Sequence, residues 1–135
     1  MRFYKVVSLT LCILFTIVGL LFLSIPDRVL MFFNTLSQSW GMLTMPTVSF
    51  GFYPLLAVGY MYVVTLLAFF MYLHPEDTRF SLLLTHAKLA TSALSLALFL
   101  LHGRYLIYIT NFIVDGFIGI VVLFLYLNIK RKLSA

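Results

Sequence analysis

The sequence predicts an all-α integral membrane protein, an antiparallel bundle of four transmembrane helices with a short amphipathic interfacial helix between the first two. Three observations lead to this class: the composition, four apolar runs of membrane-spanning length, and the placement of the cationic residues. Of the 135 residues, 63% are hydrophobic and 10% are charged, whereas soluble domains contain about 45–50% apolar and about 25% charged residues. The mean hydropathy is +1.10. A soluble core of this size cannot bury so much apolar surface, so we expect one lipid-embedded domain over residues 1–135.

The four apolar runs occupy residues 6–24, 52–73, 81–102 and 105–128. Each approaches or exceeds the roughly 20 residues that a helix needs to cross the hydrocarbon core. We expect helices because lipid offers no partner for free backbone N–H and C=O groups. The first run resembles a signal peptide, but its apolar stretch is longer than a typical signal core and no small-x-small cleavage site follows. We therefore expect it to be retained as the first span.

The cationic residues predict the orientation. Two of them, Arg28 and Arg104, lie on one side of the predicted membrane. Six lie on the other side: Arg2, Lys5, Arg79, Lys130, Arg131 and Lys132. An even number of spans places both termini on the same side, and the excess of Lys and Arg predicts that this side is cytoplasmic. The net charge of +5 sits at the ends of apolar runs, so it indicates lipid headgroups as partners and no nucleic acid.

The segment between the first two spans predicts a short helix over residues 25–40. Ser24 followed by Asp27 three residues later suggests a capping box. Apolar residues then fall broadly on one helical side, with Trp40 near the end as an interfacial anchor. The same pattern fits a helix packed as a lid on the bundle, and the sequence does not separate these two interpretations. Gly and Pro residues predict irregular structure over 41–51.

Two charges lie within the apolar runs, Lys88 in the third and Asp115 in the fourth. A Lys or Asp near the bilayer centre costs roughly 2.5–3.5 kcal/mol on insertion scales, so such residues usually face protein or water. The loop between these spans is short, so the two helices are expected to be neighbours. We therefore expect an ion pair, direct or through water, although helix rise places the residues about 10 Å apart in depth.

Other polar residues recur around this pair at helical spacings. Thr85, Ser92 and Ser95 share a face with Lys88 on the third span, and Asn111 and Gly119 share a face with Asp115 on the fourth. These residues predict an intramembrane polar seam, which serves either as a structural clasp between helices or as a path for protons, ions or polar substrates. His86 and Tyr60 are further candidates for a pathway or ligand contact.

Known catalytic and cofactor motifs are absent from the sequence, including G-x-G-x-x-G, the P-loop, H-E-x-x-H, C-x-x-C and G-x-S-x-G. We therefore expect no enzymatic activity, no metal site and no resident cofactor. The favoured function is a small non-catalytic membrane subunit or scaffold of a larger complex, with other integral membrane subunits or a second copy as partners. One alternative is a small oligomeric transporter or channel that uses the polar seam. A second is a membrane protein that binds lipid, quinone or haem.

Overall fold

The computed structural model describes residues 1–46 and 53–134, and over these residues it contains five α-helices and no strand. The helices are α1 (Arg2–Ser24), α2 (Pro26–Ser39), α3 (Tyr53–Leu73), α4 (Thr78–Leu101) and α5 (Leu106–Ser134). All except α2 contain segments long and apolar enough to cross a membrane, as expected of a multi-pass membrane protein. The all-helical prediction is confirmed. The predicted start of the second span at 52 and part of the predicted irregular segment, 47–51, lie outside the described residues.

Several helix ends differ from the predicted ends. The last helix continues to Ser134, beyond the predicted end at 128, with Arg131 and Lys132 in its last turn. Cationic side chains there interact favourably with the partial negative charge of a helix C-terminus. The predicted capping box is wrong, because Ser24 still belongs to α1 and the N-cap of α2 is Ile25, which makes no side-chain cap hydrogen bond. Pro26 occupies the first turn of α2, where its missing N–H removes no helical hydrogen bond.

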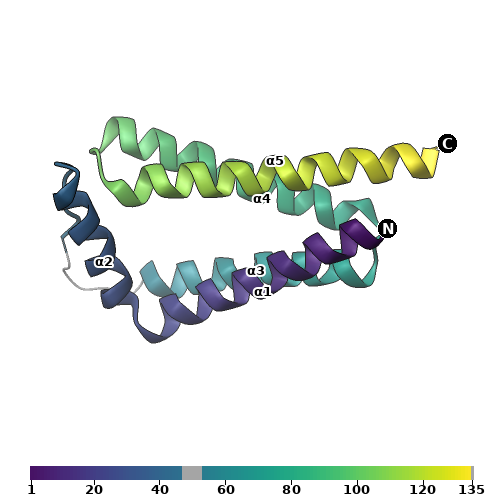
Figure 1. Cartoon of the computed structure of the whole chain (residues 1–135), viewed down its shortest axis with the longest axis horizontal. Helices are drawn as coiled ribbons and strands as arrows, with labels where there is room; N and C mark the ends of the chain where they lie inside the picture. Colours follow the sequence, from purple (N-terminus) through teal and green to yellow (C-terminus); the bar gives the residue numbers. More distant parts are fainter. Residues whose placement is uncertain (47–52, 135) are drawn as a thin grey trace.

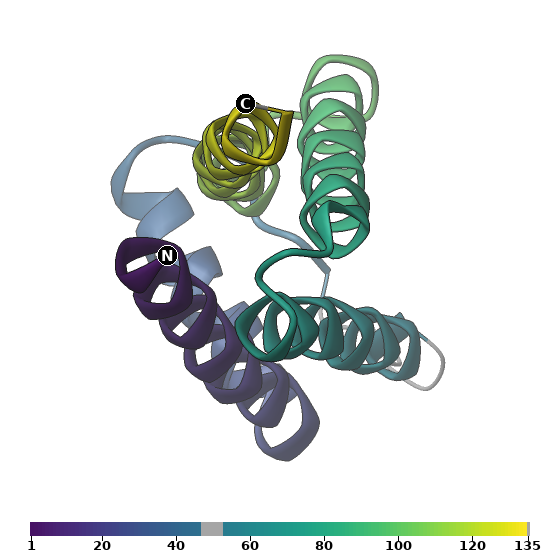
Figure 2. The same cartoon turned by 90° about the vertical axis from the view of Figure 1, so that its right-hand side faces the viewer.

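The four long helices are arranged as two closely packed pairs. One pair is α1 with α3 and the other is α4 with α5, and a smaller contact between α3 and α4 joins the pairs. Figure 1 shows both chain termini at the same end of the molecule as the connection from α3 to α4. In the end-on view of Figure 2 the four long helices surround a common centre. The hairpin between α4 and α5 thus makes the predicted neighbours, Lys88 and Asp115, part of the same pair.

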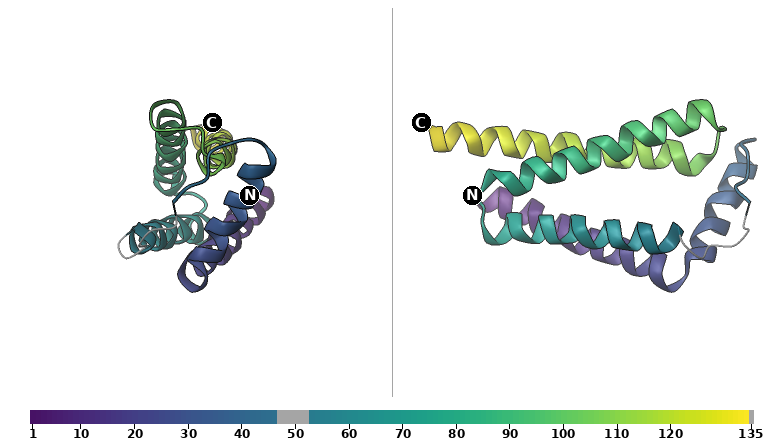
Figure 3. Two further views of the ribbon diagram at one scale, coloured as in Figure 1. Left: turned by 90° about the vertical axis from the view of Figure 1, so that its left-hand side faces the viewer. Right: turned by 180° about the vertical axis from the view of Figure 1, so that it is seen from behind.

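The helix α2 lies across the opposite end of the molecule. It contacts both α1 and α5, and Figure 3 shows it spanning the end at which the two pairs separate. Leu30 and Ser37 on its inner side are buried, whereas Phe32 and Trp40 are exposed. The Asn34 side chain exchanges two hydrogen bonds of 2.8 Å with the backbone of Met45, which fixes the chain after α2 against the helix.

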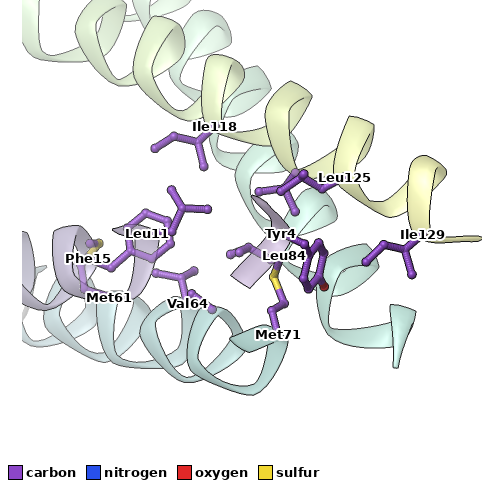
Figure 4. Close-up of a cluster of buried hydrophobic side chains, with 12 residues drawn as sticks. Tyr4, Leu11, Phe15, Met61, Val64, Met71, Leu84, Ile118, Leu125 and Ile129 are labelled. Carbon is purple, nitrogen blue, oxygen red and sulfur yellow. The ribbon is translucent and has the colours of Figure 1, made fainter. Parts of the chain in front are cut away.

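The apolar core lies between the pairs, toward the end that carries the termini. Tyr4, Leu11 and Phe15 of α1 face Val64 and Met71 of α3 in this core. Leu84 of α4 and a row of α5 residues complete it, as Figure 4 shows: Ile118, Leu125 and Ile129. The core therefore holds the two pairs together at one end, while α2 bridges them at the other.

Two glycines allow α5 to lie close against α4. A Cβ atom added at Gly119 would lie 2.7 Å from Leu89 Cδ2 and 3.0 Å from Leu89 Cγ. One added at Gly116 would lie 2.9 Å from Ser92 Oγ. Small residues at helix crossings let membrane helices approach closely and gain packing energy. The close approach of this pair therefore depends on Gly116 and Gly119.

We expect Gly119→Ala to destabilise the fold by about 1–3 kcal/mol, because overpacking forces the neighbouring side chain and backbone to shift. The matched control is Gly59→Ala on α3, where an added Cβ has no atom within 4 Å. That control should be neutral or stabilising by roughly 0.5–1 kcal/mol, since Ala favours the helix over Gly. Unfolding followed by circular dichroism in nanodiscs measures both. Equal effects at the two glycines would contradict the close packing of α4 and α5.

Candidate functional site

Lys88 and Asp115 form a direct, buried ion pair. Lys88 Nζ donates to Asp115 Oδ1 at 2.8 Å, and the side chains are 3% and 8% exposed. This confirms the expected ion pair as a direct contact. The difference in depth between the two residues is also smaller than the roughly 10 Å expected from helix rise. Counted from the connection between α4 and α5, the two residues differ by only about 6 Å of helix rise. The extended lysine stem spans such a distance, so no bridging water is needed.

The second oxygen of the carboxylate is also satisfied. Thr91 Oγ1 donates to Asp115 Oδ2 at 2.5 Å. Hydrogen bonds to an ionised group contribute about 1.5–3 kcal/mol, more than bonds between neutral groups. Thr91 is not among the site residues predicted from the sequence. The feature that could have identified it is its position three residues after Lys88, which places both side chains on the same side of α4.

Two aromatic rings enclose the lysine from the other helix pair. The ammonium lies 4.6 Å from the centroid of the Phe15 ring and 5.1 Å from that of the Tyr60 ring. Both distances fall within the range of cation–π attraction, which is strengthened when the cation is desolvated. The Tyr60 hydroxyl also lies 3.4 Å from Thr91 Oγ1 and from the carbonyl oxygen of Ala87. The site thus connects α1 and α3 to the pair formed by α4 and α5.

The buried side of α4 is almost entirely polar. Apart from Leu84, its buried residues are Ser81, Thr85, Lys88, Ser92 and Ser95. Steps of four and three residues place them in one row along the helix. This row faces the interior, while the opposite side of α4 carries exposed leucines such as Leu83 and Leu94.

The predicted seam residues beyond the ion pair make separate contacts. Ser92 Oγ donates to the carbonyl oxygen of Phe112 at 2.8 Å, and Asn111 Nδ2 donates to Ser95 Oγ at 2.6 Å. Both bonds cross between α4 and α5. Thr85 is buried, and its hydroxyl has no hydrogen-bond partner among the described residues. The structure therefore brings Ser92, Ser95 and Asn111 into one interhelical ladder with the ion pair and leaves Thr85 outside it.

His86 lies apart from this ladder. Its side chain is exposed on α4, although the neighbouring Thr85 and Lys88 are buried. A haem or a ligand at the ion pair would need a residue that faces the interior, which His86 does not. Among the described residues, no group of three or more His, Cys, Asp and Glu side chains is close enough together to hold a metal ion.

A cavity of about 260 Å³ adjoins the ion pair between the two helix pairs. Its polar lining includes Lys88, Thr91 and Asp115, and Tyr60 and Asn111 extend it. The rest of its wall is apolar, and half of these apolar residues come from α1: Leu14, Phe15, Val18 and Phe22. The paired charges therefore form one end of a largely apolar space.

A double-mutant cycle tests the ion pair. Removing one partner from a buried pair leaves an uncompensated charge and costs about 3–5 kcal/mol, whereas replacing both partners with apolar residues is far less costly. We expect Lys88→Met and Asp115→Leu each to destabilise by about 3–5 kcal/mol and the double variant to cost less than either alone, so the coupling energy of the cycle should be at least about 3 kcal/mol. Unfolding free energies measured by steric trapping in bicelles provide the comparison.

The control for the cycle is His86→Leu on the exposed side of the same helix, which should change stability by no more than about 0.5 kcal/mol. Additive effects of the two charge-removing substitutions would show that the charges do not act as a pair.

Comparison of the chain with protein-family models, with curated proteins and with solved structures gives no match. The geometry of the chain's own residues is therefore the basis for a functional assignment.

Proposed function

We propose that this chain is a small non-catalytic integral membrane protein that serves as a subunit or scaffold of a larger membrane assembly. The observation that carries the proposal is the closed arrangement of Lys88 and Asp115, the two buried charges of the described chain. Each is paired with the other, and both carboxylate oxygens accept a hydrogen bond. Catalysis or ion passage requires a charge that is free to exchange a proton or to move an ion, whereas here each charge is neutralised by the other. A charge pair formed between two neighbouring helices acts instead as an interhelical clasp.

The proposal includes an antiparallel arrangement of the four spans, with both termini in the cytoplasm. The termini lie at the same end of the molecule as the α3–α4 connection (Figure 1). The cations of that end are Arg2, Lys5, Arg79 and Lys130–Lys132, whereas Arg28 and Arg104 belong to the other end. This asymmetry follows the positive-inside rule. The amphipathic α2 then lies at the outer interface, with Phe32 and Trp40 toward lipid.

The outer face of α5 has the pattern of a surface that packs against another helix. Its exposed apolar side chains recur at steps of four, three and four residues: Ile113, Phe117, Ile120 and Phe124. This spacing is the one at which side chains of two left-handedly crossing helices interdigitate. Only 17–28% of the apolar window in each long helix is buried within the chain, so most of this surface is left for lipid or another membrane helix. We propose that the α5 face receives a membrane-spanning helix of a second subunit or of a second copy.

Co-purification tests this assignment. The full-length protein, extracted from its native membrane in polymer-bounded nanodiscs, should carry a partner chain in a fixed ratio, identified by mass spectrometry. The double variant Phe117→Ala/Phe124→Ala should reduce the amount of that partner at least several-fold, because it removes two of the large side chains that would interdigitate.

The matched control is Phe69→Ala, which makes the same change at an exposed position on α3 and should leave the partner bound. Recovery of wild type and variants alike as a monomer would contradict the subunit assignment. So would a proton or ion flux in proteoliposomes that Asp115→Asn abolishes, since that result would assign the polar seam to a pathway.

A further inference from the structure

The cavity beside the ion pair has a long apolar wall. Leu14, Val18 and Phe22 follow one another along one side of α1, and together they extend the wall by about 12 Å. Ala57 and Met61 of α3 line the cavity from the same helix pair. Figure 4 shows Phe15 and Met61 together on that side, with Ile118 of α5 across from them. The space is therefore a slot that runs along α1 between the two helix pairs.

Lys88 and Asp115 form the polar floor of the slot. Lys88 has unused hydrogen-bond donors there, and Asp115 has unused acceptors. An ammonium group has three donors, and Lys88 Nζ has one oxygen partner among the described residues, Asp115 Oδ1. A carboxylate has about four acceptor positions, and Asp115 accepts two hydrogen bonds, from Lys88 and Thr91. Buried charges favour further hydrogen bonds because few partners replace the lost water. A hydroxyl group would meet both needs, because it can accept from the ammonium and donate to the carboxylate, whereas a carbonyl oxygen would accept from the ammonium alone.

The slot opens sideways between the helix pairs. Leu14 of α1 and Val114 of α5 both line it, yet they are 43% and 47% exposed. Asn111, also on α5, is exposed as well. The helices α1 and α5 contact each other less than each contacts its own pair partner. The opening therefore faces the surroundings of the bundle, from which a molecule dissolved in lipid would enter.

We propose that this slot binds a single membrane-dissolved amphiphile, with an uncharged carbonyl- or hydroxyl-bearing head against Lys88 and Asp115 and a hydrocarbon tail along α1. The head is uncharged because the ion pair is already neutral as a unit, and a third charge in this apolar space would be unpaired. The tail is apolar because the wall of the slot along α1 is apolar. The cavity volume of about 260 Å³ lies just below the usual range of small-molecule sites, about 300–1,000 Å³, so it holds the head and the first part of the tail. This binding site goes beyond a subunit role and does not depend on it.

Photolabelling tests the proposal on the full-length protein in phosphatidylcholine nanodiscs. The probe is a long-chain fatty alcohol that carries a diazirine and a terminal alkyne, and the labelled residues are located by peptide mass spectrometry. Labelling should be saturable and concentrated on the slot-lining residues of α1 and α3. Unlabelled decanol and decylubiquinone then compete with the probe. Competition by either supports the site, and the stronger competitor identifies the head as a hydroxyl or a quinone carbonyl.

A matched pair of substitutions on α1 provides the control. Val18→Trp fills the slot and should reduce labelling at least tenfold, whereas Ile17→Trp places the same ring on the exposed side of α1 and should leave labelling unchanged. Thermal unfolding of each variant verifies that it is folded. If Val18→Trp does not fold, competition on the wild type decides the question.

The contact between the head of the amphiphile and the ion pair is tested by a separate measurement. Lys88→Met/Asp115→Leu should retain labelling but lose the preference for the alcohol probe over an alkane probe with the same tail and diazirine. The proposal is overturned by labelling that does not saturate, that neither competitor displaces, or that spreads evenly over the exposed faces of the four long helices. None of these results bears on whether α5 binds a partner chain, so the two proposals fail independently.

Discussion

The buried contact between Lys88 and Asp115 is the interaction on which the rest of the structure depends. Each charge alone would be costly when buried among apolar helices. The fold must therefore bring the two charges together and surround them with hydrogen-bonding and aromatic groups. Thr91 binds the carboxylate, while Phe15 and Tyr60 place their rings over the ammonium. These five residues come from all four long helices. Their mutual contact therefore fixes how the two helix pairs are rotated toward each other.

The same contact explains the unusual distribution of side chains on α4. Its buried row is polar and its outer side is rich in leucine, the reverse of a helix in a soluble protein. In lipid, apolar side chains gain little by facing inward, whereas hydrogen bonds and close approach hold helices together. Ser92 and Asn111 make such interhelical hydrogen bonds, and Gly116 and Gly119 permit the close approach. Between the pairs, a cavity remains beside the charges.

The features that depend on apolar length were predictable from the sequence. The four long apolar helices, the neighbouring positions of the last two, and the partnership of Lys88 with Asp115 all follow from run lengths and a short connection. The contacts made by Phe15 were not predictable, because its rotation toward Lys88 depends on how α1 is oriented and lipid-facing residues specify that orientation weakly. The capping box failed for a local reason: Ser24 continues α1 by one residue and is not free to cap α2. The cavity arises from the angle between helix pairs, which no local pattern encodes.

The most direct test of the central claim is a distance measurement in a lipid bilayer. Solid-state NMR can record the dipolar coupling between 15N-labelled lysine Nζ and 13C-labelled aspartate Cγ in the full-length protein. The structure predicts one strong coupling, from the hydrogen-bonded Lys88 and Asp115, which disappears in Lys88→Met and persists in Lys5→Met. A wild-type spectrum without a short Nζ–Cγ contact would contradict the account, since the clasp, the polar face of α4 and the floor of the slot all depend on that contact.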